Sequence, residues 1–216
     1  MGCEKMIIES LVLGPVMTNT YLLYNPGDKH GVVIDPGMEP AALVRRIQEL
    51  GLEIEAIFIT HAHFDHIGGI REVRALTKAP VYVHELEADW LGDPQKNGSS
   101  LFAGIPPIQC GPADYSLKGG EQLFFLGQDW QVMHTPGHSP GSVTYVLGSV
   151  IFCGDVLFKG SIGRTDLPGG DHDTLMRTLH DHIMELPEET RVLCGHGPET
   201  TIGREQAYNP FVTGML

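Results

Sequence analysis

The most constraining feature of this sequence is a loop rich in histidine and aspartate directly after an apolar segment. Residues 60–66 read Thr-His-Ala-His-Phe-Asp-His, so the pattern H-x-H-x-D-H follows the apolar run 54–59. In an extended loop alternate residues point the same way, and His61 and His63 can therefore share one metal ion. Asp65 and His66, where the chain turns into a helix, can reach a second ion. We therefore expect a metal site where this strand ends.

Three further residues of the same chemical types occupy matching positions elsewhere in the chain. His138, Asp155 and His196 each follow an apolar run and stand next to a glycine. Glycine has no Cβ, so it lets the backbone approach a ligand closely. With the first loop, these residues supply five histidines and two aspartates, which suits two adjacent ions. Asp155 is the best candidate for a bridge because a carboxylate has two oxygens, whereas each imidazole offers one free nitrogen.

The remaining sequence predicts many short strands and a few helices. The chain contains 27 Gly and 15 Pro, which indicates tight turns between short strands. Apolar patterning predicts helices over 39–50, 68–78 and 171–185, the last with Asp171 as its N-cap. The patterning of 85–116 is looser and predicts a helical insertion or lid. The strands are expected at 6–13, 18–24, 31–34, 54–59, 81–83, 122–125, 131–134, 142–147, 150–153 and 191–194.

The order of these elements predicts the fold class. Each half of the chain places strands first, then a helix, then a strand that ends in a histidine-bearing loop. We therefore expect an α/β fold in which two sheets pack face to face with helices outside, a four-layer αββα sandwich. The prediction is one domain over residues 1–216, with the loops at the strand ends converging on one rim.

The motifs, taken in order, resemble those of a known family. T-H-A-H-F-D-H, T-P-G-H-S-P-G, G-D and G-H-G are similar to the metal motifs of the metallo-β-lactamase superfamily. Segments 154–166 and 195–198 most resemble the short hydroxyacylglutathione-hydrolase-like proteins of its glyoxalase II-like branch. The resemblance implies one metal held by His61, His63 and His138, and a second held by Asp65, His66 and His196, with Asp155 as the bridge. It also implies that Asp35 orients the histidine loop.

The resemblance further implies a dinuclear hydrolase that cleaves S-lactoylglutathione or a similar small acyl thioester. The cofactors would be two divalent ions, zinc first, with iron or manganese as alternatives. Asp65 and Asp155 are the expected catalytic carboxylates, because Asp65 can hydrogen-bond the attacking oxygen or pass a proton to the leaving thiolate. Arg164 and Lys159 follow Asp155 in a glycine-rich loop and are the candidates for binding a substrate carboxylate.

Two other activities within the same superfamily are alternatives. A persulfide dioxygenase would bind one iron through two histidines and one aspartate, and it shares Gly163-Arg164-Thr165-Asp166 with this chain. The complete second ligand set argues against it. A β-lactamase is disfavoured because the chain opens without a secretion signal and because that branch lacks Asp155 at the bridging position.

Composition narrows the expected partners and location. The formal net charge is −13, and a protein that binds nucleic acid by releasing counterions needs the opposite sign. No apolar run approaches the roughly 18 residues of a membrane span. We therefore expect a cytoplasmic protein, a monomer or small homo-oligomer, that acts on a small molecule and binds neither nucleic acid nor membrane.

Overall fold

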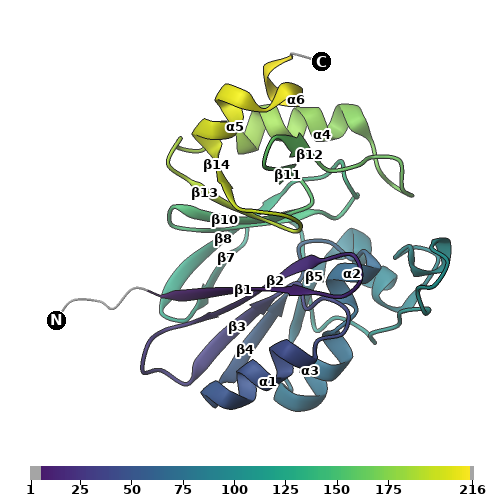
Figure 1. The fold of residues 1–216 in the computed structure, drawn as a ribbon, viewed down its shortest axis with the longest axis vertical. Helices are drawn as coiled ribbons and strands as arrows, with labels where there is room; N and C mark the ends of the chain where they lie inside the picture. The colour runs from purple at the N-terminus through teal and green to yellow at the C-terminus, as the bar shows by residue number, and fades with distance from the viewer. Residues whose placement is uncertain (1–5, 215–216) are drawn as a thin grey trace.

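In the computed structural model, which describes residues 6–214, two mixed β-sheets pack face to face and helices cover their outer faces (Figure 1). This arrangement confirms the expected αββα sandwich. Within the described residues, no helix combines the length and apolar character that crossing a membrane would need.

The first sheet comes from the N-terminal half of the chain. Its first three strands in chain order pair antiparallel, and the pairs from the third strand to the sixth are parallel. In spatial order, which is also chain order, the strands are β1 (Ile7–Leu13), β2 (Thr18–Tyr24), β3 (His30–Ile34), β4 (Glu53–Phe58), β5 (Val81–His84) and β6 (Tyr115–Leu117).

The second sheet comes from the C-terminal half, and its only parallel pair in the described chain is β10 (Val150–Gly154) with β13 (Arg191–Cys194). A separate two-stranded ribbon, β11 (Leu157–Phe158) and β12 (Ser161–Ile162), follows β10. The spatial order of the second sheet is β14 (Thr200–Thr201), β13 (Arg191–Cys194), β10 (Val150–Gly154), β9 (Val143–Leu147), β8 (Gln128–His134) and β7 (Gln122–Phe125).

Helices cover the outer face of each sheet, as Figure 1 shows. On the first sheet lie α1 (Ala41–Leu50) and α3 (Ile70–Thr77), with the short α2 (Phe64–Ile67) at the strand ends. On the second lie α4 (His172–Thr178), its π-helical continuation η3 (Leu179–Ile183), α5 (Ile202–Tyr208) and α6 (Pro210–Thr213). The 3-10 helices η1 (Glu85–Gly92) and η2 (Ser99–Leu101) belong to the connection between β5 and β6.

The central core lies between the sheets and combines aliphatic side chains with a group of packed aromatic rings. Phe58 on β4 stacks on Tyr145 of β9 at a centroid distance of 4.7 Å and meets Trp130 of β8 edge-on at 5.4 Å. All three side chains are fully buried. Such pairs add to the hydrophobic gain of burial, so the two sheets are held in one relative position.

The structure corrects several predicted elements. The segment 85–116, expected to be a helical insertion or lid, contains the 3-10 helices η1 and η2, and its last two residues already belong to β6. The predicted helix 68–78 corresponds to α3, which begins two residues later, at Ile70, and α2 is a separate short helix before it. Gly68 and Gly69 lie between the two helices; the Gly69 amide donates to Pro36 O at 2.8 Å, and a Cβ on Gly69 would overlap Gly37 O. The predicted helix 171–185 changes to π geometry after Thr178.

Candidate metal centre

The polar side chains singled out in the sequence lie at one end of the sandwich, where strands from both sheets end. His61, His63, Asp65 and His66 follow β4 of the first sheet. From the second sheet, His138 lies between β8 and β9, Asp155 follows β10 and His196 follows β13. Because parallel strands present their carboxyl ends at the same edge, the two halves of the chain bring their loops together here.

Three histidines form the first group of converging donor atoms. His138 Nε2 lies 3.1 Å from His61 Nε2 and 2.9 Å from His63 Nδ1. All three rings are buried. Burial lowers the pKa of His63 to about 3 and also lowers the pKa values of His61 and His138. The three imidazoles are therefore neutral near pH 7, which is the form that ligates a metal.

Asp65, His66 and His196 form the second group. Asp65 Oδ2 lies 3.4 Å from His66 Nε2 and 3.2 Å from His196 Nε2. Burial raises the pKa of Asp65, but the facing His66 and His196 rings outweigh it and hold that pKa below its ordinary value. The Asp65 side chain is thus a carboxylate near neutral pH and can accept hydrogen bonds.

Asp155 lies between the two groups. Its Oδ1 is 3.4 Å from His66 Nε2, and its Oδ2 is 3.7 Å from His138 Nε2 and 3.5 Å from His196 Nε2. One carboxylate therefore faces rings of both groups. This placement is what a bridging ligand requires.

Several donor atoms at this centre are buried and lack a hydrogen-bond partner among residues 6–214. They are His63 Nε2, His66 Nε2 and Asp155 Oδ1. An unpaired buried polar atom costs about 1–3 kcal/mol, so such a cluster needs a compensating ligand. Nitrogen and carboxylate donors at this spacing fit divalent cations such as zinc, iron or manganese.

The ring nitrogen that faces away from the centre has its own acceptor in three of the histidines. These bonds fix the ring orientation and the tautomer, as metal-ligating histidines generally require. His66 Nδ1 donates to Asp35 Oδ2 at 2.9 Å, and His138 Nδ1 donates to Arg164 O at 2.8 Å. His196 Nδ1 donates to Met17 O at 3.2 Å.

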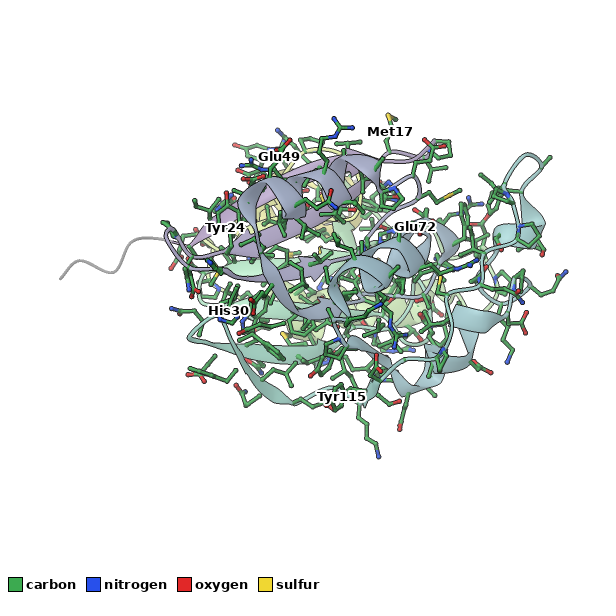
Figure 2. All side chains as sticks on the ribbon, turned by 90° about the horizontal axis from the view of Figure 1, so that it is seen from below. Met17, Tyr24, His30, Glu49, Glu72 and Tyr115 are labelled. Carbon is green, nitrogen blue, oxygen red and sulfur yellow. The ribbon has the colours of Figure 1, made fainter. Side chains whose placement is uncertain are left out.

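Asp35 and Met17 both adopt backbone conformations that non-glycine residues rarely take. Asp35, just after β3, has φ 48°, and its Oδ1 also accepts the Thr60 amide at 2.7 Å. Met17 has φ 58° and lies 66% exposed in the turn between β1 and β2 (Figure 2). Strain of this kind persists where the surroundings fix it, and here both residues contact histidines of the centre.

Glycine is required where the chain passes closest to the centre. A Cβ on Gly195 would overlap Asp155 Oδ1, and it would come within 2.7 Å of His66 Cε1. Gly154 has φ 52°, and a Cβ there would overlap Thr60 Oγ1. The expectation that glycine lets the backbone approach the site therefore holds at both positions.

A cavity of about 340 Å³ opens over the centre. Its floor includes His63, Asp65, His138, Asp155 and His196. The walls are mainly apolar and come from Val16, Phe64, Phe102, Ala103, Ile105 and Leu167. Such a shape suits a small ligand with an apolar portion and a polar group directed at the floor.

The two cations expected to bind substrate behave differently. Arg164 lines the cavity, but its guanidinium already forms a bidentate pair with Asp166, through Nε at 2.6 Å and one terminal nitrogen at 2.8 Å. Lys159 is exposed in the turn between β11 and β12 and is not among the residues that line the cavity. Of these two cations, Arg164 is therefore the one that lines the cavity over the centre.

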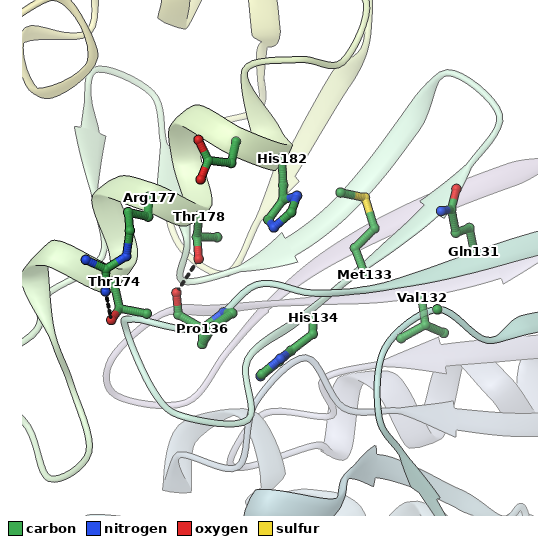
Figure 3. A pocket seen from close by; sticks show the side chains of 11 residues that line it. Gln131, Val132, Met133, His134, Pro136, Thr174, Arg177, Thr178 and His182 are labelled. Atoms are coloured by element: carbon green, nitrogen blue, oxygen red, sulfur yellow. Dashed lines mark hydrogen bonds between the residues drawn. The ribbon is translucent and has the colours of Figure 1, made fainter.

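A second cavity, of about 580 Å³, lies between β8 and α4 and contains none of the proposed ligands. Figure 3 shows His134 and His182 on its walls, with Arg177 bonded to Thr174 and Thr178 bonded to the carbonyl of Pro136. Of these two cavities, only the first is therefore lined by proposed metal ligands.

The sequence analysis missed Glu87, a fully buried glutamate in η1. Its carboxylate accepts the Ala62 amide at 2.5 Å and the Gly141 amide at 2.7 Å. The available signal was spacing, because Glu87 precedes the buried Trp90 and Leu91 by three and four residues and thus shares their inward face.

Comparison with known proteins places the chain among metal-dependent enzymes. The family model described as the metallo-beta-lactamase superfamily matches residues 13–196. A protein named "Probable metallo-hydrolase YqgX" from Bacillus subtilis is 45% identical, covering 94% of this chain and 96% of its own. "Hydroxyacylglutathione hydrolase GloC" from Haemophilus influenzae is 33% identical, covering 96% of this chain and 98% of its own.

Solved structures agree with this placement. The crystal structure of "BLEG-1 B3 metallo-beta-lactamase" is 49% identical with a TM-score of 0.92, over 96% of this chain and 100% of that one. A structure described as "TTHA1623 in a di-iron-bound form" is 40% identical with a TM-score of 0.83, over 94% and 99% of the two chains. Both similarities extend over nearly the whole fold.

Proposed function

Because this chain belongs to the metallo-beta-lactamase superfamily, we propose that it is a dinuclear metal-dependent hydrolase of small acyl thioesters. At the level of the superfamily it is a metallo-hydrolase. The observation that carries the finer proposal is the position of Asp155 between two groups of three donor residues beneath one cavity.

In this proposal the first ion is held by His61, His63 and His138, the second by Asp65, His66 and His196, and Asp155 contacts both. Ions held there would supply Lewis-acid activation of water and of the scissile carbonyl, so no serine or cysteine nucleophile is needed. The two carboxylates offset part of the positive charge. The di-iron form of one related structure supports iron as well as zinc for such a ligand set.

Asp65 has a second task in the proposed reaction. The Thr18 hydroxyl donates to Asp65 Oδ2 at 2.8 Å and fixes the carboxylate at the floor of the cavity. A carboxylate held there accepts a hydrogen bond from the attacking water and orients it toward the substrate. The same carboxylate can take a proton from that water as it attacks and pass it to the departing thiolate, which completes hydrolysis to an acid and a thiol.

The cavity supports a small substrate with a partly apolar acyl or thiol group. Phe64, Phe102 and Ile105 form its apolar walls, and Arg164 is the cation among its lining residues. The 33% identical hydroxyacylglutathione hydrolase supports a thioester as the scissile group. We therefore propose a thioester such as S-lactoylglutathione, with Arg164 placed to meet a substrate carboxylate if it leaves Asp166.

A thioester panel tests this proposal. Protein loaded with zinc should hydrolyse S-lactoylglutathione or a simpler acyl thioester under nitrogen, because hydrolysis needs no oxygen. Iron-loaded protein should consume little oxygen when supplied with glutathione persulfide. Rapid oxygen uptake by the iron form, without anaerobic thioester cleavage by the zinc form, would contradict the proposal and favour a persulfide dioxygenase.

β-Lactam hydrolysis is a second candidate because the 49% identical structure is described as a B3 metallo-beta-lactamase. Ring opening of a β-lactam attacks an amide carbonyl and uses the same polarising centre. The zinc-loaded protein should therefore be assayed with a chromogenic cephalosporin beside the thioesters. A kcat/KM at least 100-fold higher for the cephalosporin would make the β-lactam the preferred substrate class.

A further inference from the structure

We propose that Glu87 is a positioning residue that sets the geometry of the first metal-binding group, His61, His63 and His138. The inference rests on the proposed metal centre and names the residue that aligns half of it. In the described part of the chain, the Glu87 carboxylate forms no hydrogen bond to any of the three histidines. It acts on the two loops that carry them.

The geometry of Glu87 connects those loops directly. Glu87 Oε2 accepts the amide of Ala62, which lies between His61 and His63, at 2.5 Å. Glu87 Oε1 accepts the amide of Gly141, three residues after His138, at 2.7 Å. The first loop belongs to the first sheet and the second loop to the second sheet. One carboxylate therefore fixes the distance between two of the ligand-bearing loops.

The chemistry of the site requires a carboxylate at position 87. The two backbone groups that Glu87 contacts, of Ala62 and Gly141, are both N–H donors, and a carboxylate offers an acceptor oxygen to each. A glutamine would turn its NH₂ toward one of these amides and leave a buried donor without an acceptor. An aspartate is one methylene shorter and cannot span both loops from η1.

Gly141 shows how closely the contact is fitted. A Cβ at that position would lie 2.8 Å from Glu87 Cγ and 3.0 Å from Glu87 Cδ. The fully buried Glu87 side chain occupies this space instead. A side chain at position 141 would thus displace the carboxylate without removing it, which provides an independent way to disturb the same contact.

The second metal-binding group does not depend on the Glu87 carboxylate for its position. Asp65, His66 and His196 are held by other contacts, including Thr18 to Asp65 and Asp35 to His66. Loss of the Glu87 carboxylate should therefore weaken the first metal more than the second. Substitutions of residues that orient metal ligands typically lower affinity by 10–100-fold.

Zinc titration against a chromophoric chelator tests the inference, with Glu87→Gln as the variant and Glu205→Gln as the matched control. Glu205 is also fully buried and accepts the Gly160 amide at 2.7 Å, but its bonds are to Gly160, Thr200, Arg204 and Asn209 rather than to a proposed ligand. We expect Glu87→Gln to bind one zinc normally and the other at least 10-fold more weakly. Glu205→Gln should bind both as the unchanged protein does.

Single-site backgrounds identify which ion is affected. In a His196→Ala background, which retains the first group, adding Glu87→Gln should weaken the remaining zinc at least 10-fold. In a His138→Ala background, which retains the second group, it should change the remaining affinity less than threefold. Equal losses in the two backgrounds, or none in either, would overturn the inference.

Two further measurements keep the outcome decisive. Circular dichroism melting of the zinc-free proteins checks that the variants fold, and Gly141→Ala replaces Glu87→Gln if that variant does not. Gly141→Ala should show the same selective loss of the first zinc, and normal binding of both ions would overturn the inference. If the unchanged protein binds only one zinc, the dinuclear proposal fails, whereas the effect of Glu87 is still read in the His196→Ala background.

Discussion

At the scale of single residues, the centre depends on charge as much as on shape. Burial raises the pKa of Asp155, but the surrounding His66, His138 and His196 rings outweigh it and hold the pKa below its ordinary value. The side chain is only 13% exposed, so its negative charge acts with little screening by solvent. An uncharged residue of the same shape should therefore be unable to replace it.

Asp155→Asn tests this dependence on charge. The amide keeps the volume but removes the charge that opposes two cations, so we expect both ions to bind more weakly and thioester hydrolysis to fall more than about 100-fold. The matched control is Cys153→Ala, a buried residue on β10 two positions before Asp155. That change should cost about 1–2 kcal/mol of stability through a small cavity yet keep both ions. Equal metal content and rates in the two variants would contradict a bridging role.

At the same scale, the sequence pointed to the proposed ligands more clearly than to the residues that position them. His61 and His63 are two residues apart directly after a strand, and this spacing alone indicates a metal-binding loop. Glu87 belongs to no motif and lies 25 residues from Ala62, so its contact depends on how η1 packs against the centre. Contacts of that kind are products of tertiary structure and leave almost no local signal.

At the scale of elements, long apolar runs and strong caps were predicted well. The bounds of β2, β7 and β13 match the expected ranges, and Asp171 caps α4 by accepting the Thr174 amide at 2.7 Å. The elements that were missed are β6, β11, β12, β14, α5 and α6, each seven residues or shorter. Their stability comes from packing and from bonds such as Gly160 N to Glu205, so local periodicity cannot reveal them.

The docking of α1 on the first sheet predicts a measurable pH dependence. Arg46 on α1 bonds both oxygens of Glu9 on β1, at 2.6 and 2.8 Å, and Tyr24 donates to the same carboxylate. The Arg46 bonds hold the pKa of Glu9 below its ordinary value of 4.5 despite partial burial. The resulting stability is present above about pH 4.5 and is lost as the pH falls through the folded-state pKa.

Glu9→Gln should therefore destabilise the protein by about 0.5–1 kcal/mol at pH 7 and by much less near pH 3. Urea unfolding at both pH values measures the difference. Glu199→Gln, which breaks the exposed pair with Arg191, serves as the control and should cost less than about 0.5 kcal/mol. A Glu9→Gln effect that is the same at pH 3 and pH 7 would show that the ion pair does not contribute.

At the scale of the whole molecule, the centre lies where the two sheets meet. The first sheet contributes four of the proposed ligands and the second sheet three. Just behind them, the Val143 amide of β9 donates to Thr60 O at 2.8 Å and joins the sheets directly. Bound ions would therefore act as cross-links between the two halves at this end of the sandwich.

Metal removal should consequently loosen one end of the molecule more than the other. With free zinc at 1,000 times its dissociation constant, binding stabilises a protein by about 4 kcal/mol, which for a chain of this size is a melting shift of about 8–16 °C. Chelation should also speed hydrogen exchange at the Val143 amide beside the centre. The Arg191 amide, which donates to Ser149 O at 2.9 Å where β13 begins, should change much less. Equal acceleration at both amides would show that the ions stabilise the fold globally without joining the sheets at this end.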